Sequence, residues 1–496
     1  MPREAPDGIP DDGVVSGSGS APARDTAVPT SDDAARRAGP TSPESDAAIR
    51  TSRARRRRRE AEPHAHPPDA VPAERDPGPP AVIIGPCQIV TGGSEPLVLQ
   101  DGAVRVVGAH IAQIGPAGSL AAAYPEESVW PARGRVLLPG LVNMHAHLAR
   151  HLARGLEPAD PAGWGRFDRA LSAEDLHWSA MASLVEGVRH GVTTVCDFHR
   201  SGACLDLSLS EVVGAASRLG VRVATCYGSA ELDTPLERRA ALDESVSFAR
   251  DLHRRREGRL RGLVGVQAAT LEGIERLLDE ALEAASDRVA VHVDLLLDAT
   301  PAERWNPVSA WPGSPHPVLW AHAERAPRAL VAALEARGDA FSVTGTSATG
   351  ALGREIPLGW GSDSGVHAPP VFDGPPPPRA GSDRTARAEA GGPAALHYRR
   401  LFVNGHGWAS RHFGERLGRI EPGAPADLAL VDYRPATEFS DRTLLAHLVS
   451  GLMRAPVSGV MVAGEVVMDD GRLVTVDENE VVARAREAAA RVWARL

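Results

Sequence analysis

The chain is 496 residues long, with 43% hydrophobic residues and a formal net charge of -10. This length is enough for one large barrel with attachments or for two or three domains. The acidic balance argues against a nucleic-acid partner. No run of 18 apolar residues occurs, so the sequence predicts no membrane span. The N-terminus lacks the apolar core of a secretory signal, and we therefore expect a cytoplasmic protein.

The cysteine and lysine content limits which metal sites, disulfides and charged groups the chain can form. The four cysteines are scattered and show no paired spacing typical of a metal site: Cys87, Cys196, Cys204 and Cys226. We expect free thiols, most of them buried, because a cytoplasmic setting is reducing. The sequence contains no lysine, so arginine supplies every side-chain cation other than histidine.

Residues 1–80 are rich in Pro, Ala, Ser, Asp and Arg and show no apolar period. This composition predicts a disordered tail. The tail contains the arginine run "RARRRRRE", residues 53–60. We interpret the run as a solvated segment because acidic clusters surround it; a patch that binds polyanions is the alternative.

From Ala81 onward, short β-branched runs alternate with Gly and Pro, as in "AVIIGPCQIV" and "GAVRVVGAHIAQIGP". They predict antiparallel strands. The same texture returns near the end of the chain in "ADLALVDY" and "VSGVMVAGEVVMDDGRLV". We expect both sets to share one small sheet, a β-sandwich built from residues 81–138 and 421–477. A helix over residues 478–496 follows.

Helix and strand patterns alternate through the middle of the chain. The clearest helix is "SAEDLHWSAMASLVEGVRHG", residues 172–191, which Ser172 can cap. Its apolar stripe consists of Leu176, Met181, Leu184, Val185 and Val188. The strand "VTTVCDFH" follows, and further helix–strand pairs come after it. The sequence therefore predicts an α/β fold with a TIM-like (β/α) barrel over residues 139–420.

A His-x-His pair, His145 and His147, follows the apolar run "VLLPGLVNM". Side chains two residues apart on a strand point the same way, so the two imidazoles can form half of a divalent-metal site. On its own such a pair is also typical of plain surface. Three more polar residues, however, follow later apolar runs: His292, His322 and Asp363. The carboxyl ends of barrel strands meet at one face, and we therefore expect these side chains to converge.

Longer motifs support this expectation. The stretches "GRVLLPGLVNMHAH", "RFDRALSAEDLHWSAMASLVEGVRHGVTTVCDFH" and "LFVNGHGWASRHFGERLGRIEPGAPADLALVDY" resemble the amidohydrolase superfamily. The resemblance covers residues 81–480 and is to the cytosine-deaminase-like and chlorohydrolase-like branch, within it to SsnA-type aminohydrolases. It implies a metal-dependent hydrolase that acts on a non-peptide carbon–nitrogen bond of a small substrate such as a heterocycle. Relatives of this kind are commonly oligomeric.

The resemblance also implies a set of site residues. One divalent ion, Zn²⁺ or in some relatives Fe²⁺, would be held by His145, His147, His292 and Asp363. The metal would lower the pKa of a water, Asp363 would take the proton, and His322 would orient the water or steady the oxyanion. Binuclear relatives bridge their metals with a carboxylated lysine, which this chain does not have.

The chain also departs from the family pattern. Deaminase-like relatives carry a Glu three residues after the strand histidine, and Leu295 occupies that position here. Asp294 and Glu324 are the two possible replacements. The family's other two site motifs are changed as well, with Gln267 and Thr344 at histidine positions.

These departures leave two hypotheses open. The first is a working hydrolase with an altered substrate and an altered route for the proton, in which Gln267 and His199 are candidates for substrate binding. The second is a degenerate relative, a pseudoenzyme with a metal-binding or partner-binding role.

Overall fold

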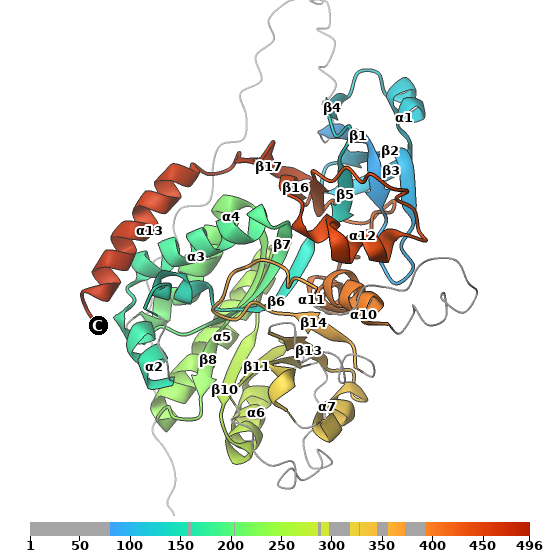
Figure 1. The fold of residues 1–496 in the computed structure, drawn as a ribbon. Coiled ribbons are helices and arrows are strands. Elements are labelled where there is room, and N and C mark those ends of the chain that lie inside the picture. The colour runs from blue at the N-terminus through green and yellow to red at the C-terminus, as the bar shows by residue number, and fades with distance from the viewer. Residues whose placement is uncertain are drawn as a thin grey trace, which may run out of the picture. The chain divides into compact units, whose positions relative to one another are not determined.

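A computed structural model describes residues 80–156, 161–202, 204–285, 289–296, 318–326, 328–344, 356–372 and 392–496 (Figure 1). They all lie in one compact unit, Arg75–Leu496. The predicted disordered tail and its arginine run lie outside the described residues, apart from residue 80. Among the described helices, none combines the length and apolarity needed to cross a bilayer.

A nearly closed parallel barrel forms the centre of the fold, as predicted. Along its sheet the strands run β6 to β7, β8, β10, β11, β12, β13 and β14, and β9 pairs with β8. Their bounds are β6 Leu141–Ala146, β7 Val192–His199, β8 Arg222–Ala230, β9 Leu260–Gly262, β10 Val264–Ala268, β11 Val291–Leu295, β12 Leu319–Ala321, β13 Ala340–Val343 and β14 Leu358–Trp360. All residues of these strands except Arg261 of β9 are buried, as strands covered on both faces should be.

The barrel closes where β14 approaches β6. A parallel bridge joins Ala146 to Asp363, just beyond the ends of the two strands. The approach is close enough to require glycine, because a Cβ on Gly361 would lie 2.9 Å from the Cβ of His145. Closure therefore brings the segment that carries Asp363 directly beside the histidine pair.

Helices cover the outer face of the barrel (Figure 1). They are α3 Ala173–Arg189, α4 Leu205–Leu219, α5 Pro235–Arg255, α6 Leu271–Ala285 and α7 Arg328–Glu335. In α3 the predicted cap is confirmed: the Ser172 and Asp175 side chains bond reciprocally to each other's backbone N–H groups. Such a capping box stabilises a helix by about 1 kcal/mol. The predicted apolar stripe of α3 is buried throughout.

Shorter elements surround the rim and the later part of the barrel. The 3₁₀ helix η1 (Leu148–Ala153) begins directly after His147, and α2 (Pro161–Ala170) follows it. After residue 391 come α10 (Pro393–Arg399), the π-helical turn η6 (Arg400–Asn404) and α11 (Gly405–Phe413). Residues 373–391, which precede α10, lie outside the described set.

A second, mixed sheet combines strands from both ends of the described chain, as predicted. Its order is β18-β17-β16-β15-β5-β1-β2-β3, with β4 also paired to β1. The bounds are β1 Ala81–Val90, β2 Val98–Val107, β3 His110–Pro116, β4 Ser128–Trp130, β5 Val136–Pro139, β15 Leu428–Val431, β16 Val457–Val462, β17 Glu465–Asp469 and β18 Arg472–Leu473. The short helices α1 (Ala117–Ala123) and α12 (Leu444–Ser450) lie in its connections.

Two details of this sheet differ from or complete the prediction. The pairing is not purely antiparallel, because β4 and β5 both pair with β1 in parallel. The chain makes this possible by returning through α1 before it forms those strands. The last helix, α13 (Glu478–Trp493), packs on α3. All four cysteines are free; three are buried and Cys204 is half-buried.

Candidate metal centre

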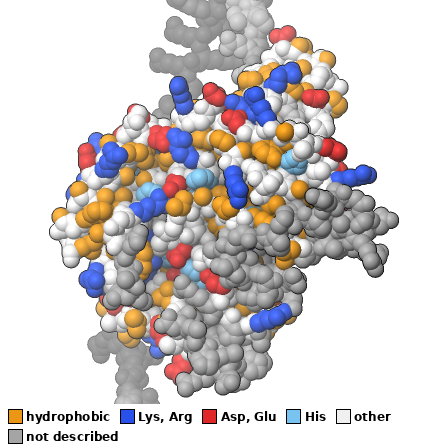
Figure 2. All heavy atoms as spheres, in the orientation of Figure 1, with side chains coloured by type: hydrophobic (Ala, Val, Ile, Leu, Met, Phe, Trp, Pro, Cys, Tyr) orange, Lys and Arg blue, Asp and Glu red, His pale blue; other side chains and the backbone are white. Residues whose placement is uncertain are grey.

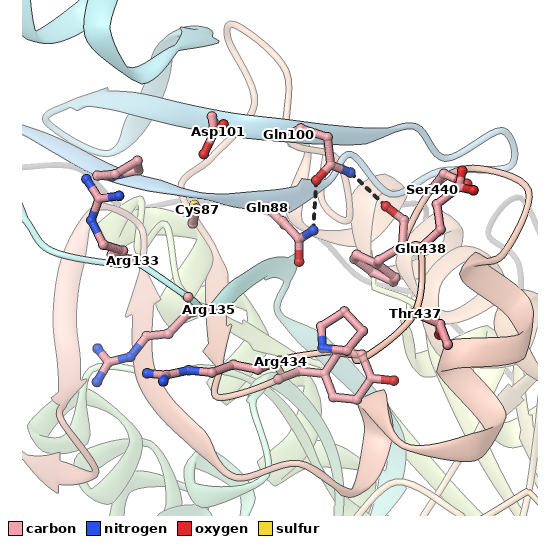
Figure 3. Close-up of a pocket in the computed structure, with 15 residues that line it drawn as sticks. Cys87, Gln88, Gln100, Asp101, Arg133, Arg135, Arg434, Thr437, Glu438 and Ser440 are labelled. Atoms are coloured by element: carbon pink, nitrogen blue, oxygen red, sulfur yellow. Dashed lines mark hydrogen bonds between the residues drawn. The ribbon is translucent and has the colours of Figure 1, made fainter.

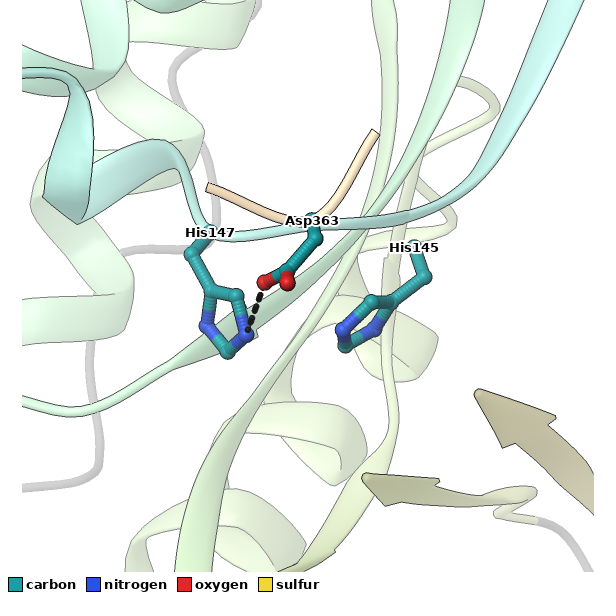
Figure 4. A group of neighbouring side chains, drawn as sticks. All are labelled: His145, His147 and Asp363. Atoms are coloured by element: carbon teal, nitrogen blue, oxygen red, sulfur yellow. Dashed lines mark ion pairs between the residues drawn. The ribbon is translucent and has the colours of Figure 1, made fainter. Parts of the chain in front are cut away.

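The His-x-His pair lies at the carboxyl end of β6, where the strand turns into η1. Figure 4 shows His145 and His147 with the Asp363 carboxylate between them. The Nε2 atom of His147 lies 3.3 Å from Oδ1 of Asp363. Both histidines are buried, whereas the Asp363 side chain is 34% exposed. Together the three form a His/Asp site able to hold a metal ion, open to solvent on the aspartate side.

Two site residues adopt an unusual backbone conformation. His322 has a φ of 58° and Asp363 a φ of 55°, in the left-handed region that non-glycine residues rarely occupy. Each lies just after a short barrel strand, β12 or β14. Such strain costs on the order of 1 kcal/mol or more and concentrates at functional sites. The turns direct both side chains inward, where His322 Nε2 and Asp363 Oδ2 are 3.7 Å apart.

Hydrogen bonds on the far side of the rings fix their orientation. The Nδ1 atom of His147 lies 2.8 Å from the carbonyl oxygen of Phe198, which can only accept a hydrogen bond. Nδ1 therefore carries the proton, and Nε2 presents a lone pair to the site. His322 is held in the same way, since its Nδ1 lies 3.2 Å from Oε1 of Glu324.

Burial keeps the imidazoles neutral. It lowers the pKa of His145 to about 3, helped by the neighbouring His322, and lowers the pKa values of His147 and His292 well below the usual value. A neutral imidazole is the form that binds a metal, so His145 and His147 are ready to coordinate at neutral pH.

Asp294 enters the same space from β11. Its Oδ1 lies 3.5 Å from Nε2 of His322 and 3.9 Å from Nε2 of His145. Its Oδ2 lies 3.7 Å from Nε2 of His147 and accepts a hydrogen bond of 2.7 Å from Gln267. His145, Asp294 and His322 thus form a second group of potential metal donors. Of the two possible replacements for the family Glu, Asp294 faces the site directly.

The other candidate, Glu324, lies behind His322. Its Oε1 accepts hydrogen bonds from the Thr344 hydroxyl at 2.7 Å and from His322. Burial alone would raise the pKa of Glu324, but the hydrogen bonds from His322 and Thr344 outweigh that effect and lower it. Glu324 and Thr344 therefore support His322.

Of the remaining predicted site residues, some reach the site and others lie apart from it. Gln267 reaches the site through its bond to Asp294, and His292 touches it through His145, whose Nδ1 lies 3.0 Å from His292 Nε2. His199 does not join the group; its Nε2 lies 2.9 Å from the Ser201 hydroxyl, and its ring contacts Tyr227 edge-on. Leu295 belongs to the apolar core between β11 and the outer helices.

Three residues that the sequence analysis missed support the site. Asn143, two residues before His145 on β6, donates to the Ser362 hydroxyl at 2.8 Å and accepts from the Ser362 N–H at 3.1 Å. The buried His367 joins the Asn143 amide to Ser183 of α3. The signal for Asn143 was present, because residues 143, 145 and 147 share one face of the strand.

The third missed residue is Arg150 on η1. Its guanidinium forms two hydrogen bonds with Asp168, of 3.0 and 2.8 Å, and lies over the ring of Trp164. Its positive charge contributes, after burial, to lowering the pKa of His147. Arg150 therefore links the rim helix α2 to the electrostatics of the site.

A separate pocket of about 590 Å³ lies in the mixed sheet (Figure 3). Three arginines line it, Arg133, Arg135 and Arg434, together with Gln88 and other residues. None of the histidines or aspartates described above contributes to its wall. On the face shown in Figure 2, the described acidic and basic side chains are interspersed, and a small group of acidic and histidine side chains lies near the middle.

Comparison with known proteins agrees with this geometry. The model of the amidohydrolase family matches residues 136–305. The 5-methylthioadenosine/S-adenosylhomocysteine deaminase of Pelotomaculum thermopropionicum is 26% identical over 441 residues, which cover 83% of this chain and 98% of the relative. Over these ranges the chain is therefore similar to the amidohydrolase family and to deaminases of adenosine derivatives. The 5'-deoxyadenosine deaminase of Methanosarcina barkeri is similar to this chain to the same degree, with 26% identity over 435 residues, 82% of this chain and 97% of the relative.

Solved structures agree with the fold of this chain. A zinc-bound adenosine deaminase from Xanthomonas campestris superposes with a TM-score of 0.63 at 20% identity, over 84% of this chain and 100% of that one. A zinc complex of atrazine chlorohydrolase from Arthrobacter aurescens gives a TM-score of 0.60 at 20% identity, over 82% and 100%. These likenesses agree with the predicted barrel and its separate mixed sheet.

Proposed function

We propose that the protein is a metal-dependent hydrolase of carbon–nitrogen bonds other than peptide bonds, specifically a deaminase of a small, purine-like substrate. The observation that carries this proposal is the convergence of neutral, oriented imidazoles and two aspartates at the carboxyl end of the barrel. The substrate class follows the curated relatives, whose names describe deaminases of adenosine derivatives. At a finer level, we propose a place near the SsnA-type aminohydrolases.

The proposed metal ligands include His145, His147 and Asp363, with Zn²⁺ as the first candidate ion and Fe²⁺ as the second. The metal would act as a Lewis acid that activates a water molecule. Asp363, which is partly exposed and lies 3.3 Å from His147, is placed to accept a proton from that water. The sequence resemblance adds His292 to the ligands, and this donor is considered in the next subsection.

His322 is the proposed polarising residue. Its Nδ1 side is held by Glu324, so its Nε2 faces the space between Asp294 and Asp363. In the deamination, the water oxygen would form a bond to the carbon that bears the amino group. The proton taken up by Asp363 would pass to the departing nitrogen, and that carbon–nitrogen bond would break to release ammonia. His322 would steady the oxygen while this occurs. Gln267 and His199 remain candidates for substrate binding. Gln267 would contact the substrate from the side of the site where it bonds to Asp294.

A second candidate function rests on one specific observation. The family Glu is replaced by Leu295, whose side chain lies in the core between β11 and the helices. A protein that binds metal but lacks a group to move the proton would be a pseudoenzyme with a metal-binding or partner-binding role. The hydrolase and the pseudoenzyme would bind the same metal, but only the hydrolase would turn over a substrate.

The experiment measures metal and ammonia together. We expect the full chain to hold about one equivalent of Zn²⁺ or Fe²⁺ by elemental analysis, and to release ammonia from at least one of 5-methylthioadenosine, S-adenosylhomocysteine, 5'-deoxyadenosine and adenosine. His147→Ala should lose both properties, whereas the exposed His253→Ala should keep both. Wild type without metal after preparation in zinc would contradict the hydrolase, and metal without turnover would support the pseudoenzyme.

The domain division that we propose follows the sequence. It comprises a tail over residues 1–80, sheet segments over 81–138 and 421–477, a barrel over 139–420 and a helix over 478–496. The proposed setting is the cytoplasm. The partner is a small-molecule substrate, not a nucleic acid or a membrane, and the chain is a candidate homo-oligomer.

A further inference from the structure

We infer that Asp294 is a ligand of the metal ion and takes the coordination position that the sequence resemblance assigns to His292. This inference rests on the proposed function, because it names a donor of the same site. The Asp294 carboxylate oxygens lie 3.5–3.9 Å from the Nε2 atoms of His322, His147 and His145. Two ligands each about 2.1 Å from a tetrahedral ion lie about 3.4 Å apart, so this spacing suits donors that share one ion.

The lone pair of His292 is already in use. If His145 binds the metal through Nε2, its Nδ1 must carry the proton. That proton is donated to Nε2 of His292, 3.0 Å away. The same lone pair of His292 cannot also bind the metal. His292 then acts as the hydrogen-bond acceptor that orients His145, the supporting role that metal-binding histidines usually require on their second nitrogen.

In the tautomer described above, Nδ1 of His292 carries the proton, so it cannot bind the metal although it too has no hydrogen-bond partner among the described residues. Asp294 can coordinate instead. It is 1% exposed, and its Oδ1 has no hydrogen-bond partner among the described residues; the same is true of Nε2 of His145. A buried ionised oxygen without a partner is costly, and a bound cation removes that cost. The unpartnered oxygen and the unpartnered nitrogen face each other across 3.9 Å, as two ligands of one ion would.

Gln267 holds Asp294 in this position. The two residues are Cα partners in the β10–β11 register, and the Gln267 amide donates to Oδ2 of Asp294 at 2.7 Å. A hydrogen bond to one carboxylate oxygen fixes the other, which is the arrangement that tunes metal ligands in many sites. Gln267, at a position where the family has a histidine, thus acquires a role as a positioning residue.

The inferred ligand set has a chemical consequence. Two carboxylates with His145 and His147 form a harder set than three imidazoles with one carboxylate, and carboxylate oxygens favour Mn²⁺ and Fe²⁺ more than imidazole nitrogens do. The two aspartates also balance the charge of a divalent ion within the buried site. We therefore expect Mn²⁺ to compete with Zn²⁺ better than it would at a three-imidazole site.

The test compares Zn²⁺ affinity, measured by competition with a chelator, among full-length variants. Asp294→Asn should weaken Zn²⁺ binding at least about 100-fold, because it removes a charged ligand. His292→Gln keeps an acceptor for the His145 proton and should cost less than about 10-fold. Leu295→Val changes a neighbouring core side chain on the same strand and should leave the affinity within about 3-fold. Binding by Asp294→Asn at wild-type affinity, or loss of metal from His292→Gln alone, would overturn the inference.

A second measurement decides the point even if Asp294→Asn does not fold. X-ray absorption of the zinc-loaded wild type and of His292→Gln should show the same number of imidazole ligands; one fewer in the variant would assign the position to His292. Wild type that binds no metal would refute this inference together with the proposed hydrolase. Wild type that binds metal through Asp294 but releases no ammonia would refute only the proposed reaction.

Discussion

The backbone N–H of His147 donates to the carbonyl oxygen of Asp363 at 3.0 Å. In return, the carbonyl of His145 accepts the N–H groups of Ser362 and Asp363 at 2.8 and 3.0 Å. The first and last strands of the barrel are therefore joined at the residues that carry the proposed ligands. We call these contacts of His145 and His147 with Ser362 and Asp363 the seam. The same contacts close the barrel and bring the proposed ligands together, so substitutions at the seam should affect both the stability of the barrel and the site.

Asn143 tests this coupling. Its side chain bonds Ser362 twice and supports the His145 backbone, so Asn143→Ala leaves buried groups of the seam without partners. We expect the free energy of unfolding of the metal-free protein to fall by about 1–3 kcal/mol. Zn²⁺ affinity should fall by about 10–100-fold, as for a lost supporting partner. Denaturant unfolding and chelator competition measure the two effects.

The control for Asn143 is Asn404→Ala. Asn404 also donates one side-chain hydrogen bond to a barrel strand, to the carbonyl of Leu358 at 2.8 Å, and among the described residues it has no hydrogen bond to a proposed ligand. Asn404→Ala should lower the free energy of unfolding without lowering the Zn²⁺ affinity. Equal metal affinity in both variants would contradict the coupling of seam and site.

The Arg150–Asp168 pair is expected to show the penalty of a buried charge. Both residues are buried and share two hydrogen bonds. Arg150→Met or Asp168→Leu alone should lower the free energy of unfolding by about 3–5 kcal/mol, because each leaves one charge buried without its partner. The double variant should be closer to wild type than either single variant. A strictly additive double variant, measured in denaturant with metal removed, would argue against the pair.

Asp197 predicts a pH dependence of stability. Its oxygens accept hydrogen bonds from the Leu148 N–H and the Thr225 hydroxyl, yet burial raises its pKa to about 7. Between the ordinary pKa of an aspartate and pH 7, the folded state thus binds more protons than the unfolded state. Asp197 should therefore lower stability as the pH rises through that window, by up to a few kcal/mol at an order-of-magnitude level.

The measurement is a comparison with Asp197→Asn, which cannot ionise. Relative to Asp197→Asn, the wild type should lose unfolding free energy as the pH rises from 5 to 8, with metal removed throughout. Asp279→Asn, an exposed change on α6, should show no such trend. A difference for Asp197→Asn that stays constant with pH would contradict the raised pKa.

The last helix, α13, should stabilise the loop that follows the histidine pair. Trp493 donates its indole N–H to the carbonyl of Leu152 at 2.8 Å, and Arg491 and Arg495 both bond Asp175 at the start of α3. Trp493→Phe keeps most of the ring but removes the donor, and should cost about 1 kcal/mol. Hydrogen exchange over residues 148–156 should then become faster. Arg484→Gln, whose ion pair is with Glu487 on the same helix, should leave that exchange unchanged.

Much of the fold could be predicted because its signals are local. The α3 helix has its cap, its apolar stripe and its ending glycine within a single stretch of sequence. The alternation of helices and strands then restricts the sheet to parallel order, which brings the strand ends together. His322 and Asp363 could be found by that reasoning alone, before any contact between them was known.

The parts that escaped prediction depend on side-chain direction or on distant partners. Asp294 faces the site because it lies two residues from His292, but the residue that the family pattern marks is Leu295, which faces the core. The partnership of His292 with His145 depends on which ring nitrogen points where, and the sequence carries no such information. Arg150 and Asp168 lie 18 residues apart on two different helices, and no pattern in the sequence pairs them.

The pairing of β5 with β15 has a consequence for how the chain is made. Val136 lies opposite Val431, and the whole barrel lies between them in the sequence. At ~5–20 residues per second, a ribosome needs tens of seconds to synthesise the intervening segment. During that interval the edge of β5 has no strand to cover it and can pair with other nascent chains. We therefore expect the yield of folded protein in cells to depend on translation speed and chaperone supply more than its equilibrium stability would indicate.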